Sequence, residues 1–555
     1  MKAELIVTNG RVLTMDSANP RAEAVALAQG RILAVGSRAD VEALAGSETR
    51  VIDAGGRTVL PGFFESHLHL GIGGTQLGHL DIGGMHGMEA LKAAFAAYAA
   101  ANPDSPVLMA RSADYAIFDH PTTRHDLDQV LADRPIALMG MDLHTCWVNT
   151  AALKATDLLH GREMPHGHEV VMGEDGFATG VLLEFEAFAP VMALAQEERI
   201  NLGIATGGEP RTPPTPEERA IDKAHFLAGL RHCARHGITS MVMMDGNRYT
   251  LEILRELQED GDLLARVKVP FHFKPTTDLS ELDRAEAMDR DFHDDWLRSG
   301  HVKMFMDGVV DSRTAFMVED YPDAPGHRAE PLFEPERFKE IATEVDRRGL
   351  QIVVHCCGDG AVRTVIDGYE AARLANGPRD SRHRIEHIEL IQRSDIPRLG
   401  ELGIVASLQP SHPPGAMDFP LMPTLDRIAP ARLRDAYLWK TLADHGAHVA
   451  YASDWPVADV NVMRGLKAAL TRKPYAGDLP DERLGLMASL YAFTAGGAEA
   501  AHFDDVTGRL VAGLAGDLVV IDGDIEATSP EAFDQLDIAL TIAGGSITYS
   551  AGGFA

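Results

Sequence analysis

Two histidines two residues apart end an apolar segment near the N-terminus and are the first candidates for chemistry. Residues 61–70 read PGFFESHLHL, so the segment carries His67 and His69. In an extended strand alternate side chains leave the same face, and both imidazoles would therefore point the same way, with Leu68 opposite. Neutral imidazole is a ligand for zinc and similar cations. The pair predicts half of a metal site, although two structural histidines would share this spacing.

Four more polar residues lie in segments that are otherwise apolar. They are Lys303 in VKMFMDG, His355 in VVHCCGDG, His387 in RIEH and Asp454 in ASDWP. A single such residue is most often a satisfied group of the core. Six at matching strand ends are difficult to explain as coincidence, so we expect them to converge.

The elements that must position these residues alternate between strand and helix. We predict a first strand within residues 61–70 and further strands around 238–245, 266–273, 301–308, 351–358, 383–390, 404–411 and 448–455. We predict helices over 222–236, 251–260, 334–348, 359–374 and 433–445; just past helix ends lie Gly237, Gly261, Gly349 and Gly446, where a left-handed cap favours glycine. Eight strand–helix units are the number in a TIM barrel, whose functional groups lie at the C-terminal strand ends.

The two ends of the chain differ from this middle, because both read as short strands and turns. We predict one β-sandwich from residues 1–58 and 505–555, and the barrel from 59–71 and 222–504. Residues 72–221 do not follow the alternation, so we interpret them as an insertion after the first barrel strand. At the active-site end, such an insertion would act as a cap over the substrate.

Composition narrows the classes of partner. The 555 residues carry a net charge of −31, which disfavours binding to nucleic acid. The four cysteines are scattered, which fits reduced thiols and a cytoplasmic location. The N-terminus lacks the apolar core of a signal peptide, and no apolar run reaches the roughly 18 residues of a membrane span. We therefore expect a small-molecule substrate and no membrane partner.

The sequence resembles the amidohydrolase superfamily, and within it the amidohydrolase-3 branch that includes N-substituted formamide deformylases. The likeness spans nearly the whole chain and rests on PGFFESHLHL, VKMFMDG, VVHCCGDGA, RIEHIE, ASLQPSH and ASDWP, together with segments 142–149 and 508–522. Each motif alone is weak, but the set is specific. The resemblance implies an α/β protein, a distorted TIM (β/α)8 barrel with a β-sandwich, that acts as a metal-dependent hydrolase. A homodimer or larger homo-oligomer is common in the superfamily, and the sequence leaves this open.

The resemblance also implies a ligand set. His67, His69 and Asp454 would hold one divalent ion, and His355 and His387 a second. A lysine ammonium has no lone pair for a metal, so Lys303 would have to react with CO2 and bridge the ions as a carbamate. The alternatives are a charged Lys303 that pairs with a nearby carboxylate, and a mononuclear site. Zinc is the first expectation for the metal, with Mn, Fe, Co and Ni as alternatives.

The reaction implied is hydrolysis of a non-peptide C–N bond in an N-acyl or N-formyl amine by metal-bound hydroxide. Asp454 would act as general base and then as general acid. Deaminases of the superfamily carry a glutamate three residues after the strand-five histidine, where this chain has Gly358. This disfavours deamination of an aromatic amine and favours hydrolysis of an amide, carbamate or ester-like bond. An amide is the leading hypothesis, with a carbamate, lactone or ester as alternatives, and a catalytically dead barrel is disfavoured because all six ligands are present. Candidates for the substrate pocket are His144, Gln409, His412, Trp455 and Asp307, and structural roles are equally open for His144 and Trp455.

Overall fold

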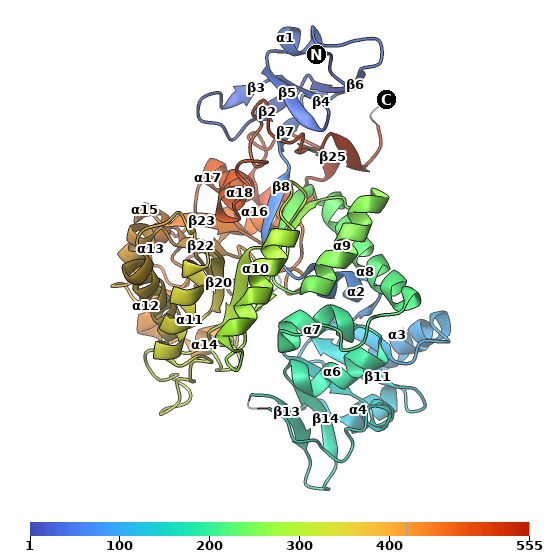
Figure 1. Ribbon diagram of the computed structural model, residues 1–555. Helices are drawn as coiled ribbons and strands as arrows, with labels where there is room; N and C mark the ends of the chain where they lie inside the picture. Colours follow the sequence, from blue (N-terminus) through green and yellow to red (C-terminus); the bar gives the residue numbers. More distant parts are fainter. Residues whose placement is uncertain (142, 166, 418, 554–555) are drawn as a thin grey trace. The chain divides into compact units, whose positions relative to one another are not determined.

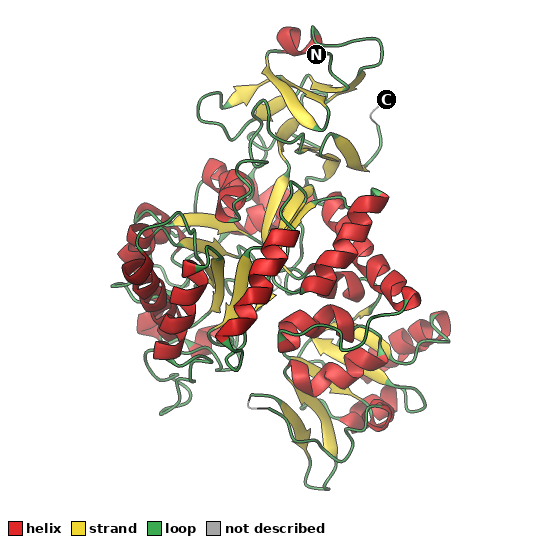
Figure 2. Cartoon of the chain, in the orientation of Figure 1, coloured by secondary structure: helices red, strands yellow, loops and turns green. Residues whose placement is uncertain are grey.

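A computed structural model of the chain describes residues 1–141, 143–165, 167–417 and 419–553. The protein is mixed α/β, with helices and strands throughout the chain (Figures 1 and 2). It divides into two compact units: one is Leu70–Gly229, and the other combines Met1–His69 with Leu230–Ala555. Among the residues that the structure describes, no helix has both the length and the apolar composition required to cross a bilayer.

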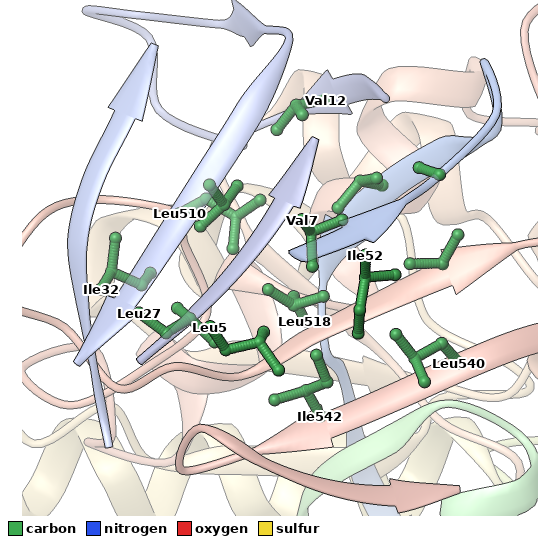
Figure 3. Close-up of a cluster of buried hydrophobic side chains, with 14 of the residues drawn as sticks. Leu5, Val7, Val12, Leu27, Ile32, Ile52, Leu510, Leu518, Leu540 and Ile542 are labelled. Carbon is green, nitrogen blue, oxygen red and sulfur yellow. The ribbon is translucent and has the colours of Figure 1, made fainter. Parts of the chain in front are cut away.

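Strands from the two ends of the chain form two sheets that share a core. The first sheet contains, in spatial order, β5 (Arg31–Gly36), β4 (Ala24–Ala28), β1 (Leu5–Thr8) and β6 (Arg50–Asp53). The second contains β26 (Ser546–Ser550), β25 (Ile538–Ala543), β24 (Leu518–Ile521), β7 (Thr58–Pro61), β2 (Arg11–Leu13) and β3 (Arg21–Ala22). Val7 and Leu27 of the first sheet join Leu518, Leu540 and Ile542 of the second in one buried apolar cluster (Figure 3). The N- and C-terminal segments therefore stabilise each other.

The chain passes from these sheets to the central strands at Gly62. β7 pairs antiparallel with β24 and continues through Gly62 into β8 (Phe63–Leu68), which carries His67. A Cβ atom at Gly62 would lie 2.1 Å from Oγ1 of Thr239, closer than carbon and oxygen atoms can approach. Glycine is required there because β8 packs so closely against the next strand.

The central strands form two parallel sheets. One has the order β18 (Leu297–Arg298), β16 (Arg266–Lys268), β15 (Ile238–Met243) and β8. The other has the order β17 (Phe271–His272), β19 (His301–Phe305), β20 (Gln351–Cys356), β21 (Arg384–His387), β22 (Val405–Leu408) and β23 (His448–Tyr451). The single strand predicted at 266–273 is therefore wrong: it is divided into β16 and β17. Pro270 lies between them and has no backbone N–H for the ladder.

Two backbone hydrogen bonds connect the last of these segments to the first. Asp454 N donates to the carbonyl oxygen of His67 at 2.9 Å, and His69 N donates to that of Trp455 at 2.7 Å. The chain after β23 thus continues the pairing along the C-terminal end of β8. This brings side chains from opposite ends of the strand order to one place.

Helices lie between the strands in the order expected. They include α8 (Pro216–Arg235), α9 (Arg248–Asp260), α11 (Pro335–Arg347), α12 (Asp359–Asn376) and α15 (Trp439–Asp444). The unit that combines Met1–His69 with Leu230–Ala555 has further helices: α1 (Arg38–Glu42), α10 (Leu282–Asp291), α13 (Ile396–Leu402), α14 (Thr424–Arg427), α16 (Val462–Thr471), α17 (Leu486–Ala492) and α18 (Ala495–Ala500). The four glycines predicted near helix ends all have positive φ, as a left-handed turn requires. The helix predicted at 433–445 is shorter, because residues 430–435 form a 3-10 helix instead.

Residues Leu70–Gly229 form their own sheet and core. The sheet order is β13 (Glu169–Met172), β14 (Ala178–Leu183), β12 (Thr145–Val148), β11 (Ile136–Gly140), β10 (Leu108–Ala113) and β9 (Leu80–Asp81). The helices are α2 (Leu70–Gln76), α3 (Met88–Ala101), α4 (Arg124–Val130), α5 (Thr150–Ala155), α6 (Phe185–Leu194) and α7 (Glu198–Thr206). Leu91, Phe95, Leu108 and Leu138 belong to a buried cluster of this unit. The unit therefore has an apolar core of its own.

Candidate metal centre

Three of the predicted ligands meet at one carboxylate oxygen. Oδ1 of Asp454 lies 3.2 Å from Nε2 of His67 and 3.3 Å from Nε2 of His69. All three side chains are buried, and their ligand atoms lie within 4.8 Å of one another. The backbone hydrogen bonds between residues 67–69 and 454–455 fix this approach. The arrangement offers two imidazoles and a carboxylate to one cation.

The backbone at this site is strained where it turns the ligands inward. Asp454 has φ +62° and His387 has φ +73°, a left-handed conformation that is uncommon for residues other than glycine. Burial alone would raise the pKa of Asp454, but the two neighbouring histidines outweigh it and hold this pKa well below its usual value. Asp454 is therefore an ionised carboxylate.

A buried carboxylate orients His67. Oε2 of Glu386 accepts a hydrogen bond from Nδ1 of His67 at 2.6 Å, and Arg384 donates to both Glu386 oxygens at 2.8 and 2.9 Å. Burial alone would raise the pKa of Glu386, but the charge of Arg384 and the hydrogen bond from His67 outweigh it and hold this pKa well below its usual value. The carboxylate is therefore ionised. With the proton of His67 on Nδ1, its Nε2 is left to face Asp454.

A second group of possible ligands lies beside the first. Nδ1 of His387 bonds to Oε1 of Gln409 at 2.9 Å, which leaves Nε2 of His387 available. Nε2 of His412 lies 3.7 Å from Oδ2 of Asp454, and the rings of His387 and His412 are nearly parallel. Ligand atoms of His387, His412 and Asp454 lie within 4.8 Å of one another.

His355 is not among these converging ligand atoms, and its pairing with His387 on a metal stays a prediction. Its Nε2 lies 2.9 Å from the carbonyl oxygen of Gly308, to which it donates a hydrogen bond. Its ring remains close to that of His387, with centroids 4.5 Å apart. The loop that follows β19 therefore engages one of the two ring nitrogens of His355.

Lys303 is buried with its amine unsatisfied. It projects from β19 with 1% of its surface exposed, and among the described residues its Nζ has no hydrogen-bond partner. Burial lowers the pKa of Lys303 to about 8, against the opposing influence of Glu386 and Asp454. Burial therefore favours the neutral form of this amine, which is the form that can act as a nucleophile.

Comparison with known proteins decides the family. A sequence profile described as the amidohydrolase family matches residues 50–549. The chain belongs to the amidohydrolase family.

Two curated relatives and one solved structure illustrate the range of this amidohydrolase's neighbours. The protein LONG AFTER FAR-RED 3 of Arabidopsis thaliana is 30% identical over 94% of this chain and 87% of its own. An N-substituted formamide deformylase of Arthrobacter pascens is 24% identical over 98% of both chains. The structure of an uncharacterized metal-dependent hydrolase from Pyrococcus horikoshii has a TM-score of 0.72 and 21% identity over 95% of this chain and 98% of its own. This structural likeness shows a shared fold.

The other residues predicted for the substrate pocket of the amidohydrolase have contacts of their own. Asp307 is buried, and its carboxylate accepts hydrogen bonds from the backbone N–H groups of Phe316, Cys357 and Gly358 at 2.8–3.0 Å. Burial nonetheless raises its pKa to about 7. Asp307 therefore connects the loops after β19 and β20, and its contact with a substrate stays a prediction.

Trp455 and His144 also contact other side chains of the protein. The Trp455 ring is buried and stacks on His232 at 5.2 Å between centroids. Nδ1 of His144 lies 2.9 Å from Glu184 within the unit of residues 70–229. Asp142, which opens the motif of His144, lies outside the described residues.

Sequence reasoning missed several buried polar residues of the amidohydrolase site. They are Glu386 and Arg384, described above, with Glu65 and His272. Glu65 accepts a hydrogen bond from Ser453 N at 2.8 Å, and burial raises its pKa to about 8. His272 pairs in register with Lys303 between β17 and β19, and neither of its ring nitrogens has a partner among the described residues. The sequence pattern that could have identified these residues is a charged or polar residue within a short apolar strand.

Proposed function

We propose that this amidohydrolase hydrolyses an N-acyl or N-formyl amine, using a divalent ion held by His67, His69 and Asp454. The observation that carries the proposal is the approach of both Nε2 atoms to one oxygen of Asp454. We propose in addition that the parallel strands form a distorted TIM barrel and the terminal sheets a β-sandwich. The backbone bonds between β8 and the segment after β23 support the first, and the shared core supports the second.

The residues present fit a metal ion. Since Nδ1 of His67 is bonded to Glu386, its Nε2 is the atom turned toward Asp454, 3.2 Å away. A cation between these two atoms would take the place of a bridging proton. Neither Oδ1 of Asp454 nor Nδ1 of His69 has a hydrogen-bond partner among the described residues. Two histidines and one carboxylate are a donor set that zinc and related ions accept.

The chemistry then divides between the ion and the side chains. A divalent ion supplies Lewis acidity, which makes water a stronger acid and polarises a carbonyl oxygen. Asp454 takes a proton from the attacking water and delivers it to the leaving nitrogen. Glu386 keeps His67 in the tautomer that the site requires, and Arg384 keeps Glu386 ionised.

Lys303 and a second ion complete the proposal. The amine of Lys303 is buried and has no hydrogen-bond partner among the described residues, so it is suited to carbamate formation with CO2, which would turn a cation that cannot bind a metal into an anionic ligand. His387 and His412 would hold the second ion, since their ligand atoms converge with Asp454. In a Lys303→Ala variant, short carboxylic acids should restore part of the activity and of the second equivalent of metal. No restoration by any acid would contradict the carbamate.

Support for an amide substrate is indirect but consistent. The formamide deformylase of Arthrobacter pascens is a relative along nearly the whole chain. Gly358 occupies the position where deaminases of the superfamily carry a glutamate, and a Cβ atom there would lie 2.1 Å from the carbonyl oxygen of Phe316. No larger side chain fits that position, so deamination through a glutamate there is disfavoured.

A substrate panel with metal removal tests the proposal. The protein as purified, a chelator-treated sample and a reconstituted sample would be assayed with N-benzylformamide, p-nitroacetanilide and p-nitrophenyl acetate. We expect hydrolysis of at least one amide, loss on chelation and recovery with zinc or manganese. Ester hydrolysis without amide hydrolysis would favour the alternative reaction. Amide hydrolysis that survives complete metal removal would contradict the proposal.

A further inference from the structure

Two buried side chains lie side by side on neighbouring strands of the central sheet. His272 of β17 and Lys303 of β19 are register partners in the parallel ladder, and Phe273 N donates to the carbonyl oxygen of Lys303 at 3.0 Å. The two residues are 3% and 1% exposed. Register partners on adjacent strands leave the sheet on the same side, so the imidazole of His272 lies beside the side chain of Lys303.

The polar atoms of both side chains have unmet hydrogen bonds. Nδ1 and Nε2 of His272 and Nζ of Lys303 are buried, and none of the three has a hydrogen-bond partner among the residues that the structure describes. Nζ of Lys303 lies 4.6 Å from the centre of the Phe305 ring, so its surroundings on that side are apolar. An unsatisfied buried polar atom lowers the stability of a fold. Three such atoms on two register partners point to one partner that both side chains share.

The carbamate of Lys303 has the chemistry of that partner. The lone pair of the neutral amine attacks the carbon of CO2 and forms a C–N bond, one C=O electron pair moves to oxygen, and the nitrogen releases a proton to water. The product carries one N–H and two oxygens that share a negative charge. An imidazole has at least one ring N–H in both its neutral and its charged form, so His272 can donate to one of these oxygens. A hydrogen bond to an ionised acceptor is stronger than one between neutral groups.

We propose that His272 is a positioning residue whose ring N–H donates to a carbamate oxygen of Lys303 and holds the carbamate in place. The inference rests on the carbamate of the proposed function and adds a residue that lies outside the predicted ligand set. In the sheet order, β17 and β20 flank β19 on opposite sides. His272 therefore supports Lys303 from the side opposite to His355.

The test measures the carbamate itself on the full-length protein in the presence of zinc. The protein would be depleted of CO2 and titrated with 13C-labelled bicarbonate at constant pH, and the carbamate carbon would be followed by 13C NMR. Lys303→Ala assigns the signal, because the carbamate cannot form there. His272→Leu should raise the half-saturating bicarbonate concentration by about tenfold or more, and a factor of ten corresponds to about 1.4 kcal/mol.

Two further variants separate the hydrogen bond from the loss of a buried histidine. His272→Gln keeps an N–H donor and should restore part of the affinity for CO2. His301→Leu removes a histidine of β19 that is 1% exposed and whose ring nitrogens also have no hydrogen-bond partner among the described residues. His301 lies two residues before Lys303, about 7 Å along the strand, so this variant should bind CO2 as the parent does.

A second measurement on the parent protein does not depend on how well a variant folds. Saturation with bicarbonate should shift the ring 15N resonances of His272, which the His272→Gln spectrum identifies. Unshifted resonances at full carbamate occupancy would overturn the inference.

The other outcomes distinguish this inference from the proposed function. Equal half-saturation in the parent and His272→Leu would mean that water alone satisfies His272, and an equal loss in His301→Leu would mean that His272 has no specific role. Either result overturns the inference and leaves the carbamate standing. No carbamate signal in the parent at saturating bicarbonate would contradict both. Absence of amide hydrolysis with the carbamate present would contradict the proposed reaction alone.

Discussion

The candidate metal centre and the core of the terminal sheets are equally buried but built in opposite ways. Leu518, Leu540 and Ile542 are fully buried in a cluster of apolar side chains (Figure 3). His67 and Asp454 are almost as buried, yet they place a nitrogen and a carboxylate oxygen 3.2 Å apart. Burial of apolar side chains stabilises the core of the terminal sheets. At the candidate metal centre, buried charges and strained backbone lower the stability of the fold, and such features are typical of functional sites.

The largest expected effect comes from Asp454. Asp454→Asn should lower turnover by about 10³-fold or more, because the amide cannot accept the proton of the attacking water. Asparagine tolerates positive φ, so the variant should fold and keep part of its metal. Turnover and metal content of the purified variant check this, and wild-type turnover would disprove the role of Asp454.

A matched aspartate outside the centre provides the control for this prediction. Asp346 is buried beside His383 and Arg379, and although burial raises its pKa, these hydrogen bonds hold the pKa below its usual value. A lowered carboxylate pKa stabilises the fold above about pH 4, and this contribution is lost as pH falls. Asp346→Asn should therefore cost about 2 kcal/mol at neutral pH, less in acid, and leave metal content unchanged.

The next effect distinguishes two histidines near His387. His412→Ala should remove about one equivalent of metal, since Nε2 of His412 converges with His387 and Asp454. His355→Ala should lose less metal, because its Nε2 is already bonded to Gly308. Elemental analysis of both variants checks the order. The reverse order would restore the pairing of His355 with His387 that the sequence suggested.

A smaller effect should follow from loosening His67 without removing it. Glu386→Gln keeps the size of the side chain but removes the charge that fixes the His67 tautomer. We expect metal affinity to fall by about 10–100-fold, the usual cost of losing such a supporting group. Competition with a chelating dye measures this, and unchanged affinity would show that Glu386 serves only the fold.

The smallest effect on function should come from the apolar core. Leu540→Ala should lower the free energy of unfolding by about 2–5 kcal/mol, because it removes a fully buried side chain. Metal content and turnover per folded molecule should not change. A loss of metal at constant folded fraction would show that the two regions are coupled.

Much of the arrangement could be predicted from strand periodicity. The His-x-His spacing at the end of β8 accounts for two imidazoles on one face, and the polar residues in β19, at the end of β21 and after β23 could be expected near them. The division at Pro270 was missed, although proline interrupts a ladder.

Backbone reversals account for the part that could not be predicted. Alternation in β21 would put Glu386 and His387 on opposite faces, yet both reach His67: Glu386 by a 2.6 Å bond, and His387 with ring centroids 5.0 Å apart. The positive φ of His387 turns its side chain, and nothing in the sequence signals this at a residue other than glycine. The engagement of His355 by Gly308 likewise depends on a loop, for which spacing rules give no answer.

The crossing at Gly62 has a consequence for the far end of the chain. His67 lies in β8, which continues from β7. β7 pairs with β24 (Leu518–Ile521), a strand that follows His67 by about 450 residues in the chain. During synthesis, His67 and His69 therefore cannot be held firmly until β24 has been made. The candidate metal centre should therefore form late in synthesis. A truncation that removes β24 to β26 should disrupt the sheet that contains β7 and also release the metal ion.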